Sequence, residues 1–482
     1  MQSNSKAIRF KTQGKLRWLL LICLLLFISK GFGKAKVSVE FLTPAPAQLV
    51  EVDMPIGNSF SFDNPVYYTV TNGKFSFEVN VSRATLLQIK TSFKRIFVVV
   101  GPDENIRIKI IKTFDKYKVL SFEGPNAEGQ YWYNVYNDQP LANRISHEEL
   151  FSALSAKSKN AGLEKLGKFI GSQIQPLTNL FKQGKINSQF YVLIKNEIRA
   201  MHALYIAQNI KNLQDKISNR NDIQNYQVII NAAMAFGGPN NVENARNMFG
   251  QSFLMDYYAT LAINKGKETS PEWGPYYGFT LAPDSMKMLS LGNILTFAKV
   301  TGTSEFDYKK TYALYKKEFP RSPYITFLDT VNAKKEQVET TGNIRLNTPT
   351  NYKTFADLRQ HYKGRAVYID LWASWCMPCR GEFPYYQKLR PILKKRNITS
   401  VFISIDRPEA KKTWQTLINF NHLEGDHILV NKNLMKDIVA TIYKNGEVSI
   451  PRYILIDKKG QVISWDAPRP SNSDLLPMLA KM

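Results

Sequence analysis

The chain has 482 residues, enough for roughly two to four domains. Hydrophobic residues make up 44% of it, which excludes a mainly disordered chain. Its three cysteines are too few for a scaffold held together by disulfides. Lysine and arginine outnumber the acidic residues by 64 to 40, and the formal net charge is +24. The composition indicates a globular, basic, multi-domain protein whose few cysteines have to be considered one by one.

Residues 1–33 have the pattern of a secretory signal peptide. They contain six basic residues and no acidic residue. The apolar run from Trp18 to Ile28 is too short to span a membrane, which takes about 20 residues, and has the length of a signal core. Gly31-Phe32-Gly33 offers a cleavage site, so we expect export to the periplasm or cell envelope. The alternative is an uncleaved N-terminus that keeps contact with the membrane.

Cleavage after this segment would change both the charge and the cysteine count. It would lower the net charge of +24 by six units, to +18, and it would remove Cys23. The remaining basic residues form no arginine-rich stripe with interleaved aromatic residues, so we do not expect nucleic acid as a partner. The mature chain would keep one pair of cysteines, Cys376 and Cys379.

Residues 34–124 are predicted to form an antiparallel β domain. Apolar and polar residues alternate from Lys74 to Val81, as in a half-buried strand. Asn72-Gly73 separates this segment from residues 66–71, and this dipeptide readily takes the positive φ angles of a tight hairpin turn. A second alternating segment runs from Ile106 to Ile110. Short strands at this spacing indicate a small β-sandwich, and nothing in them indicates catalysis.

From residue 125 to residue 335 the apolar pattern becomes helical. Ser146 and Glu149 have the spacing of a capping box, in which each side chain bonds the backbone of the other. Phe236-Gly237-Gly238-Pro239 interrupts the region, and residues 306–319 are helical again. We expect a helical domain or a long helical connector here.

The polar stretch 332–343 resembles a linker and leads into a last domain, residues 336–482. In that domain, a strand-like run from Ala366 to Trp372 precedes Cys376 and Cys379, and apolar residues at helical spacing follow. The two cysteines therefore lie where a strand gives way to a helix. Free amides and the dipole at a helix N-terminus stabilise an anion, so the first thiol can ionise near neutral pH. Two intervening residues in a turn let the two sulfurs bond reversibly.

Three other interpretations of this pair fit less well. A structural zinc site needs four ligands, and the nearest upstream histidine, His361, lies fifteen residues before Cys376. A permanent disulfide across so short a loop would stabilise the fold little. A pair of inert buried thiols is not expected in an oxidising compartment. The pattern favours a dithiol–disulfide redox site that uses neither a metal nor a cofactor.

At these residues the sequence resembles the thioredoxin superfamily, whose W-C-x-P-C active site matches residues 375–379. Over about residues 345–482 it is more closely similar to the exported TlpA and ResA proteins of Bacteroidetes type. Glu382-Phe383-Pro384 matches the extension that follows the cysteines in that branch. Ile450-Pro451 precedes a strand, at the place where the family has a cis-proline. The resemblance implies an α/β thioredoxin-like fold for the last domain.

The resemblance also implies roles for the matching residues. Cys376 would be the nucleophile that forms a mixed disulfide, and Cys379 would resolve it. Asp370 falls where thioredoxins keep a buried carboxylate that exchanges a proton with the resolving thiol, unless it is an ordinary strand-end aspartate. Glu382 resembles the acidic active-site residue of the branch, unless it is a solvated helix acid.

A further group of residues would form the rim of the site and bind substrate: Trp375, Ile450 and Pro451. A cis-proline at position 451 would leave the neighbouring backbone free to pair with an extended substrate. Met377 is uncommon between the two cysteines, so the redox potential cannot be transferred from relatives.

We therefore expect a thiol–disulfide oxidoreductase that acts on protein cysteines in the cell envelope, as a reductant supplied with electrons by a membrane donor. The alternative is an envelope binding or scaffold protein whose thioredoxin-like domain only docks. The intact cysteine pair argues against that alternative, because docking alone would not need it. A peroxide-reducing enzyme would need a cysteine after a Pro/Thr loop, and this arrangement is not found.

Overall fold

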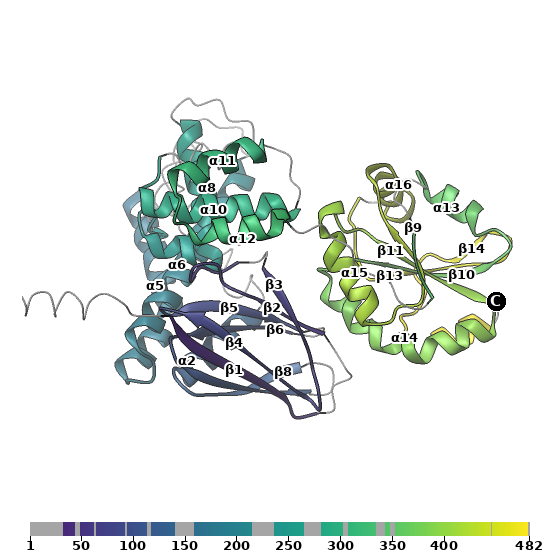
Figure 1. The fold of residues 1–482 in the computed structure, drawn as a ribbon, viewed down its shortest axis with the longest axis horizontal. Helices are drawn as coiled ribbons and strands as arrows, with labels where there is room; N and C mark the ends of the chain where they lie inside the picture. The colour runs from purple at the N-terminus through teal and green to yellow at the C-terminus, as the bar shows by residue number, and fades with distance from the viewer. Residues whose placement is uncertain are drawn as a thin grey trace, which may run out of the picture.

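A computed structural model describes most of the chain after the signal-like segment. The predicted signal up to residue 31 with Cys23, the capping box at Ser146 and Glu149, and linker residues 334–342 lie outside the described residues. The described ranges are 32–43, 49–61, 64–91, 94–112, 117–139, 159–214, 236–264, 281–301, 307–333, 343–347, 352–444 and 446–480. Strands come first, helices follow, and a mixed α/β unit comes last (Figure 1), which confirms the predicted fold class.

The first group of strands forms two four-stranded sheets, with the orders β4-β1-β7-β8 and β3-β2-β5-β6. All neighbouring strands are antiparallel except β1 and β7, which are parallel. The apolar core of this sandwich is built from both sheets, and in β4 buried and exposed residues alternate as predicted. The strands are β1 (Gly33–Phe41), β2 (Leu49–Asp53), β3 (Pro65–Thr69), β4 (Lys74–Val81), β5 (Thr85–Lys90), β6 (Arg95–Val100), β7 (Asn105–Lys112) and β8 (Tyr117–Glu123).

The turn between β3 and β4 corrects one expectation. Asn72 and Gly73 do adopt positive φ angles, 51° and 72°, which these two residue types reach at low cost. An antiparallel bridge between Thr71 and Lys74 closes the predicted tight turn, but the pairing does not continue, because β3 pairs with β2 and β4 pairs with β1. The turn carries the chain from one sheet to the other, so that the alternating apolar residues of β4 enter the core from the opposite side.

A helical region covers the outer face of the β3-β2-β5-β6 sheet. Its core includes Leu86, Phe97 and Val99, which belong to β5 and β6. Among the helices that the structure describes, none is both long and apolar enough to cross a membrane. The helices are α2 (Ala127–Asp138), α5 (Lys159–Lys182), α6 (Ser188–Gln214), the short 3₁₀ helix η1 (Val242–Arg246), α8 (Met248–Asn264), α10 (Asp284–Thr301), α11 (Tyr308–Glu318) and α12 (Pro323–Ala333).

The carboxyl-terminal unit is built on one six-stranded sheet with the order β14-β13-β10-β11-β12-β9. Every residue of β10 is buried, because α14, α15 and α17 cover one face of the sheet and α13 and α16 cover the other. The elements are β9 (Ile344–Asn347), α13 (Phe355–His361), β10 (Ala366–Trp372), α14 (Met377–Lys395), β11 (Ile398–Ser404), η2 (Pro408–Ala410), α15 (Lys411–Phe420), β12 (Gly425–Leu429), α16 (Lys432–Ile442), β13 (Arg452–Ile456), β14 (Val462–Ser464) and α17 (Leu475–Ala480).

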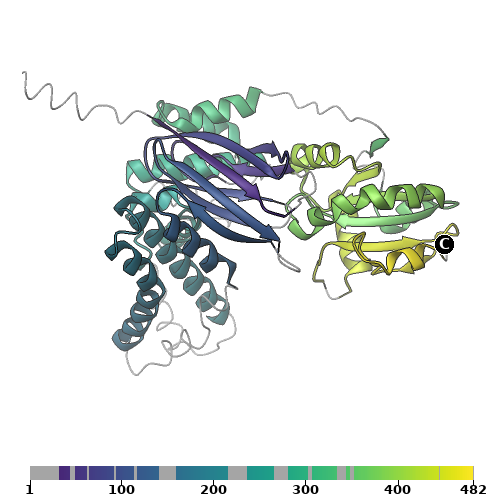
Figure 2. The same ribbon diagram turned by 90° about the horizontal axis from the view of Figure 1, so that it is seen from below.

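The sandwich and the carboxyl-terminal unit touch each other (Figure 2). The ring of Tyr67 from β3 packs against the core on the α14 side of the six-stranded sheet. Its hydroxyl donates to Thr413 Oγ1 of α15 over 3.4 Å. Glu51 of β2 forms an ion pair with Arg380 of α14, with 3.4 Å between the nearest oxygen and nitrogen. The contact therefore reaches the first turns of the helix that carries the cysteine pair.

Candidate active site

The cysteine pair lies at the junction that the sequence predicts. β10 ends at Trp372, and after a short loop Cys376 is the N-cap of α14. Cys376 and Cys379 form a disulfide, with 5.3 Å between their Cα atoms. The Sγ of Cys376 accepts a hydrogen bond from the amide of Cys379 over 3.2 Å. Pro378 falls in the first helical turn, where its missing N–H costs nothing. The site thus places one sulfur among the free amides of a helix start.

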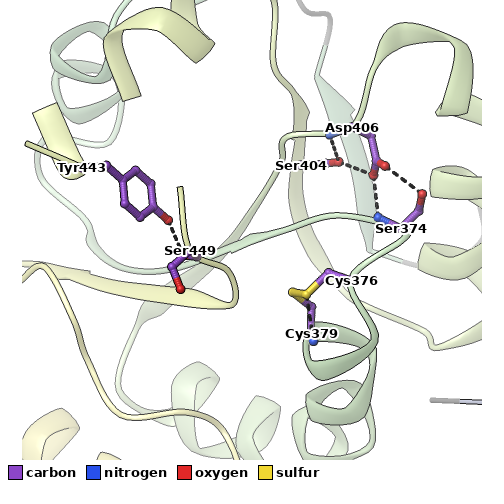
Figure 3. The surroundings of a disulfide bond; sticks show 7 residues. All are labelled: Ser374, Cys376, Cys379, Ser404, Asp406, Tyr443 and Ser449. Atoms are coloured by element: carbon purple, nitrogen blue, oxygen red, sulfur yellow. Dashed lines mark hydrogen bonds between the residues drawn. A yellow bond between two sulfur atoms is a disulfide. The ribbon is translucent and has the colours of Figure 1, made fainter. Parts of the chain in front are cut away.

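A buried hydrogen-bond network holds the loop before Cys376 (Figure 3). Asp406 Oδ2 accepts from the amide of Ser374 over 2.7 Å and from the hydroxyl of Ser404 over 2.6 Å. Asp406 Oδ1 accepts from the Ser374 hydroxyl over 2.8 Å. Burial raises the pKa of Asp406, while these hydrogen bonds act to lower it. The Ser404-x-Asp406 spacing at the end of β11 was the available sequence sign of this anchor.

Asp370 lies within β10 and is fully buried. The hydroxyl of Tyr386 donates to its Oδ2 over 3.1 Å, and Oδ1 has no hydrogen-bond partner among the described residues. Burial raises the pKa of Asp370 to about 8; the hydrogen bond from Tyr386 opposes this rise, and the charge of Glu382 adds to it. Asp370 is thus a fully buried carboxyl with a raised pKa, within the strand and away from solvent.

Glu382 is buried on α14 rather than solvated, with 7% of its surface exposed. Its two oxygens accept from the amide and the hydroxyl of Ser471, over 2.9 and 3.0 Å. This pairing ties the first turns of α14 to the segment that precedes α17. Sequence patterns did not point to Ser471, because it lies 89 positions away from Glu382.

The three predicted rim residues lie in two loops. Trp375 directly precedes the nucleophile position and is 60% exposed. The Ile450–Pro451 peptide is cis, as the resemblance implied, and both residues are half-buried. The hydroxyl of Tyr443 donates to the carbonyl of Ser449 over 2.7 Å and so holds the segment before the proline (Figure 3).

Within the described ranges, no group of three or more histidine, cysteine, aspartate or glutamate side chains could hold a metal ion. Arg380 follows Cys379 directly and is 3% exposed, which is unusual for an arginine. Its partner Glu51 lies 329 positions away, so no local pattern could have predicted the pair.

Comparison with known proteins finds relatives for the carboxyl-terminal part. The chain matches the Redoxin family over residues 337–475. It is 30% identical over 114 residues to the thiol-disulfide oxidoreductase ResA of Geobacillus kaustophilus, a match that covers 22% of this chain and 60% of the relative. ResA of Bacillus thuringiensis is 29% identical over 102 residues, with 21% and 54% covered. The chain thus spans little more than half the length of these curated relatives.

Two solved structures from Bacteroides species are also partly similar. The thioredoxin domain of a thiol-disulfide oxidoreductase from Bacteroides vulgatus is 28% identical, with a TM-score of 0.23, and the match covers 25% of this chain and 81% of that chain. A thiol:disulfide interchange protein from Bacteroides sp. is 25% identical, with a TM-score of 0.22 and coverages of 25% and 75%. The family match covers the residues of β10 and α14, between which the cysteine pair lies. Residues 337–475 of this chain therefore form a thioredoxin-superfamily domain of the TlpA/ResA-like type.

Proposed function

We propose that the chain is an exported thiol–disulfide oxidoreductase that reduces protein disulfides in the cell envelope through Cys376 and Cys379. The observation that carries this proposal is the place of Cys376 at the N-cap of α14, where its sulfur accepts from a backbone amide. A thiolate at such a place is stabilised, and the thiolate is the form that attacks disulfides. The curated relatives of this domain are named as thiol-disulfide oxidoreductases.

The reaction moves two electrons to the substrate. The Cys376 thiolate attacks one sulfur of a substrate disulfide, forms a mixed disulfide and releases the other substrate sulfur as a thiolate. Cys379 then loses its proton and attacks the sulfur of Cys376, which frees the second substrate thiolate. The substrate ends as a dithiol, and the protein ends with the Cys376–Cys379 disulfide that the structure contains. A dithiol donor, which we place at the membrane, returns two electrons before the next cycle.

Asp370 is suited to take the proton from Cys379. Its pKa of about 8 is close to that of a free thiol, about 8.5, so the two groups can exchange a proton near neutral pH. Cys379 shares one buried cluster with Tyr368 and Trp372, which flank Asp370 on the same face of β10. Glu382 acts on this step through its charge, which raises the pKa of Asp370 further.

The exposed ring of Trp375 and the segment around Ile450 and Pro451 form the substrate rim in this proposal. Export rests on the basic segment and apolar run before Lys34. The reductant role predicts a reduction potential nearer to about −270 mV, as in thioredoxin, than to about −120 mV, as in a strong oxidant of this superfamily.

Insulin reduction tests the activity. The protein in the presence of dithiothreitol should speed the reduction of insulin disulfides, and Cys376→Ser should abolish this acceleration. Cys379→Ser should slow turnover, because the mixed disulfide is no longer resolved. The proposal fails if the wild-type protein does no better than dithiothreitol alone. Peroxide consumption without insulin reduction would indicate a peroxide-reducing enzyme instead.

A further inference from the structure

Four charged side chains meet where the sandwich contacts α14. Glu51 and Asp53 come from β2, Lys90 comes from β5 and Arg380 comes from α14. Lys90 Nζ lies 2.7 Å from Glu51 Oε1 and 2.9 Å from Asp53 Oδ2, and Arg380 Nη1 lies 3.4 Å from Glu51 Oε2. Glu51, Asp53 and Arg380 are each less than 9% exposed. The cluster is thus an ionic contact between two domains that is largely shielded from water.

The charges in this cluster balance only when the two domains are in contact. Glu51, Asp53 and Lys90 together carry one net negative charge, and Arg380 brings the sum to zero. Burial by itself would raise the pKa of Glu51, but the charges of Lys90 and Arg380 hold it below its ordinary value. Glu51 is therefore ionised at neutral pH. Because a buried charge left without a partner is costly, Glu51 and Arg380 hold each other in place.

Arg380 lies close to the nucleophile along the helix. It is four residues after Cys376, and its amide donates to the carbonyl of Cys376 over 3.1 Å. Cys376 caps α14 and Arg380 follows within its first turns, so the two residues are about one helical turn apart along the chain. A guanidinium at this position favours a thiolate at Cys376. A carboxylate paired with the guanidinium cancels part of this effect.

We propose that Glu51 of the sandwich is a positioning residue for the redox site, acting through Arg380. It holds the guanidinium against β2 and offsets its charge at Cys376, so that the sandwich sets how oxidising the Cys376–Cys379 disulfide is. The inference rests on the proposed function only in requiring that Cys376 and Cys379 interconvert between disulfide and dithiol. It gives the amino-terminal domain a part in the chemistry that the cysteine motif alone does not show.

The test is the equilibrium of the full chain with glutathione, in which the protein disulfide and two glutathione thiols give the protein dithiol and glutathione disulfide. Glu51→Gln should shift this equilibrium about tenfold towards the dithiol, which corresponds to about 30 mV, because the uncompensated Arg380 stabilises the thiolate. The pKa of the Cys376 thiol, measured from the pH dependence of alkylation, should fall in the same variant. Asp370 and Glu382 are unchanged in it and cannot cause the shift.

Two controls separate this effect from a general structural one. Glu51→Asp keeps the charge and should stay near wild type. Glu78→Gln breaks an exposed ion pair with Lys34 in the same sandwich and should change nothing. Both variants should unfold with the same cooperativity as the wild-type chain.

A double-mutant cycle then asks whether Glu51 acts through Arg380. Arg380→Gln alone should shift the equilibrium towards the disulfide, opposite to Glu51→Gln, and this variant remains informative if Glu51→Gln does not fold. In the Arg380→Gln background, Glu51→Gln should have no further effect. An unchanged equilibrium in Glu51→Gln, or an equal shift in both backgrounds, would overturn the inference. A wild-type disulfide that does not equilibrate with glutathione at all would instead contradict the proposed function.

Discussion

Asp370 is the residue at which burial acts most directly on the candidate chemistry. It is fully buried, it accepts one hydrogen bond from Tyr386, and its pKa is raised to about 8 from the ordinary value of 3.8. In the unfolded chain the same carboxyl would lose its proton near pH 4. The folded protein therefore holds this proton more tightly than the unfolded chain does. The contribution of the protonated Asp370 carboxyl to the free energy of unfolding is complete below about pH 4. This contribution is lost as the pH rises towards 8.

Asp370→Asn should consequently stabilise the oxidised protein, and more so at high pH. The amide has the same shape, can still accept from Tyr386 and never ionises. We expect the gain in free energy of unfolding to be on the order of 3 kcal/mol larger at pH 9 than at pH 5. Urea titrations of the disulfide form at the two pH values measure this difference, with the exposed Asp474→Asn as control. An equal gain at both pH values would mean that the pKa of Asp370 is not raised.

At the scale of elements, side chains of α2 complete the edge of a sheet. β6 is an edge strand, so its outer amides and carbonyls have no neighbouring strand. Gln130 bonds both the amide and the carbonyl of Val99, and Asn134 does the same for Phe97, over 2.6 to 3.0 Å. These buried side-chain amides replace a further strand and keep the edge from pairing with another chain.

Replacing either amide by a hydrocarbon should leave buried backbone groups without partners. Gln130→Leu and Asn134→Leu are each expected to lower the free energy of unfolding by about 1–3 kcal/mol, and β6 amides should then exchange hydrogen faster. Gln175→Leu, at an exposed position of α5, is the matched control and should have little effect. If the edge variants unfold like the control, the edge is not held by α2.

Elements with a strong local pattern could be predicted from the sequence. Residues 366–372 are apolar on both faces and form β10, and the helix after the cysteines begins where the strand-to-helix change predicted it. The tight turn at Asn72-Gly73 was predicted correctly, but its flanking strands pair elsewhere, because these two residues determine the shape of the turn and not which strands pair. Which strands pair depends on which of the two sheets each strand joins to bury its apolar face. That choice is decided by contacts between residues distant in sequence.

At the scale of the whole molecule, the sandwich and the thioredoxin-like domain share a buried ion pair. Glu51 has a lowered pKa, so the stability it provides is present above its ordinary pKa of 4.5 and is lost as the pH falls through the lower value of the folded state. Glu51→Gln should reduce the free energy of unfolding by about 3 kcal/mol at pH 7. This difference should shrink in urea titrations as the pH falls through the lowered pKa of Glu51, because the wild-type carboxyl then becomes protonated as well. A cost that does not change with pH would indicate lost packing instead of lost charge.

The contacts of the site that could not be predicted are those between residues distant in sequence. The redox pair Cys376 and Cys379 follows from a pattern a few residues long, and the cis peptide before Pro451 was implied by the family resemblance. The partners of Asp370, Glu382 and Arg380 lie 16, 89 and 329 positions away and are brought together only by the fold. A sequence shows that such charged or polar residues exist, whereas their burial and pairing follow from the packing of whole domains.

The most direct test of the central claim is the capture of a mixed disulfide on Cys376. Reduced Cys379→Ala, mixed with a peptide that contains one disulfide, should form a stable one-to-one adduct. Intact-mass and peptide mass spectrometry should place the adduct on Cys376, and dithiothreitol should reverse it. The matched Cys376→Ala variant should react far more slowly, because Cys379 lies inside α14 with no exposed surface, whereas Cys376 is the N-cap and is 4% exposed. No adduct in Cys379→Ala, or equal adducts in both variants, would contradict the assignment of Cys376 as the nucleophile of a thiol–disulfide oxidoreductase.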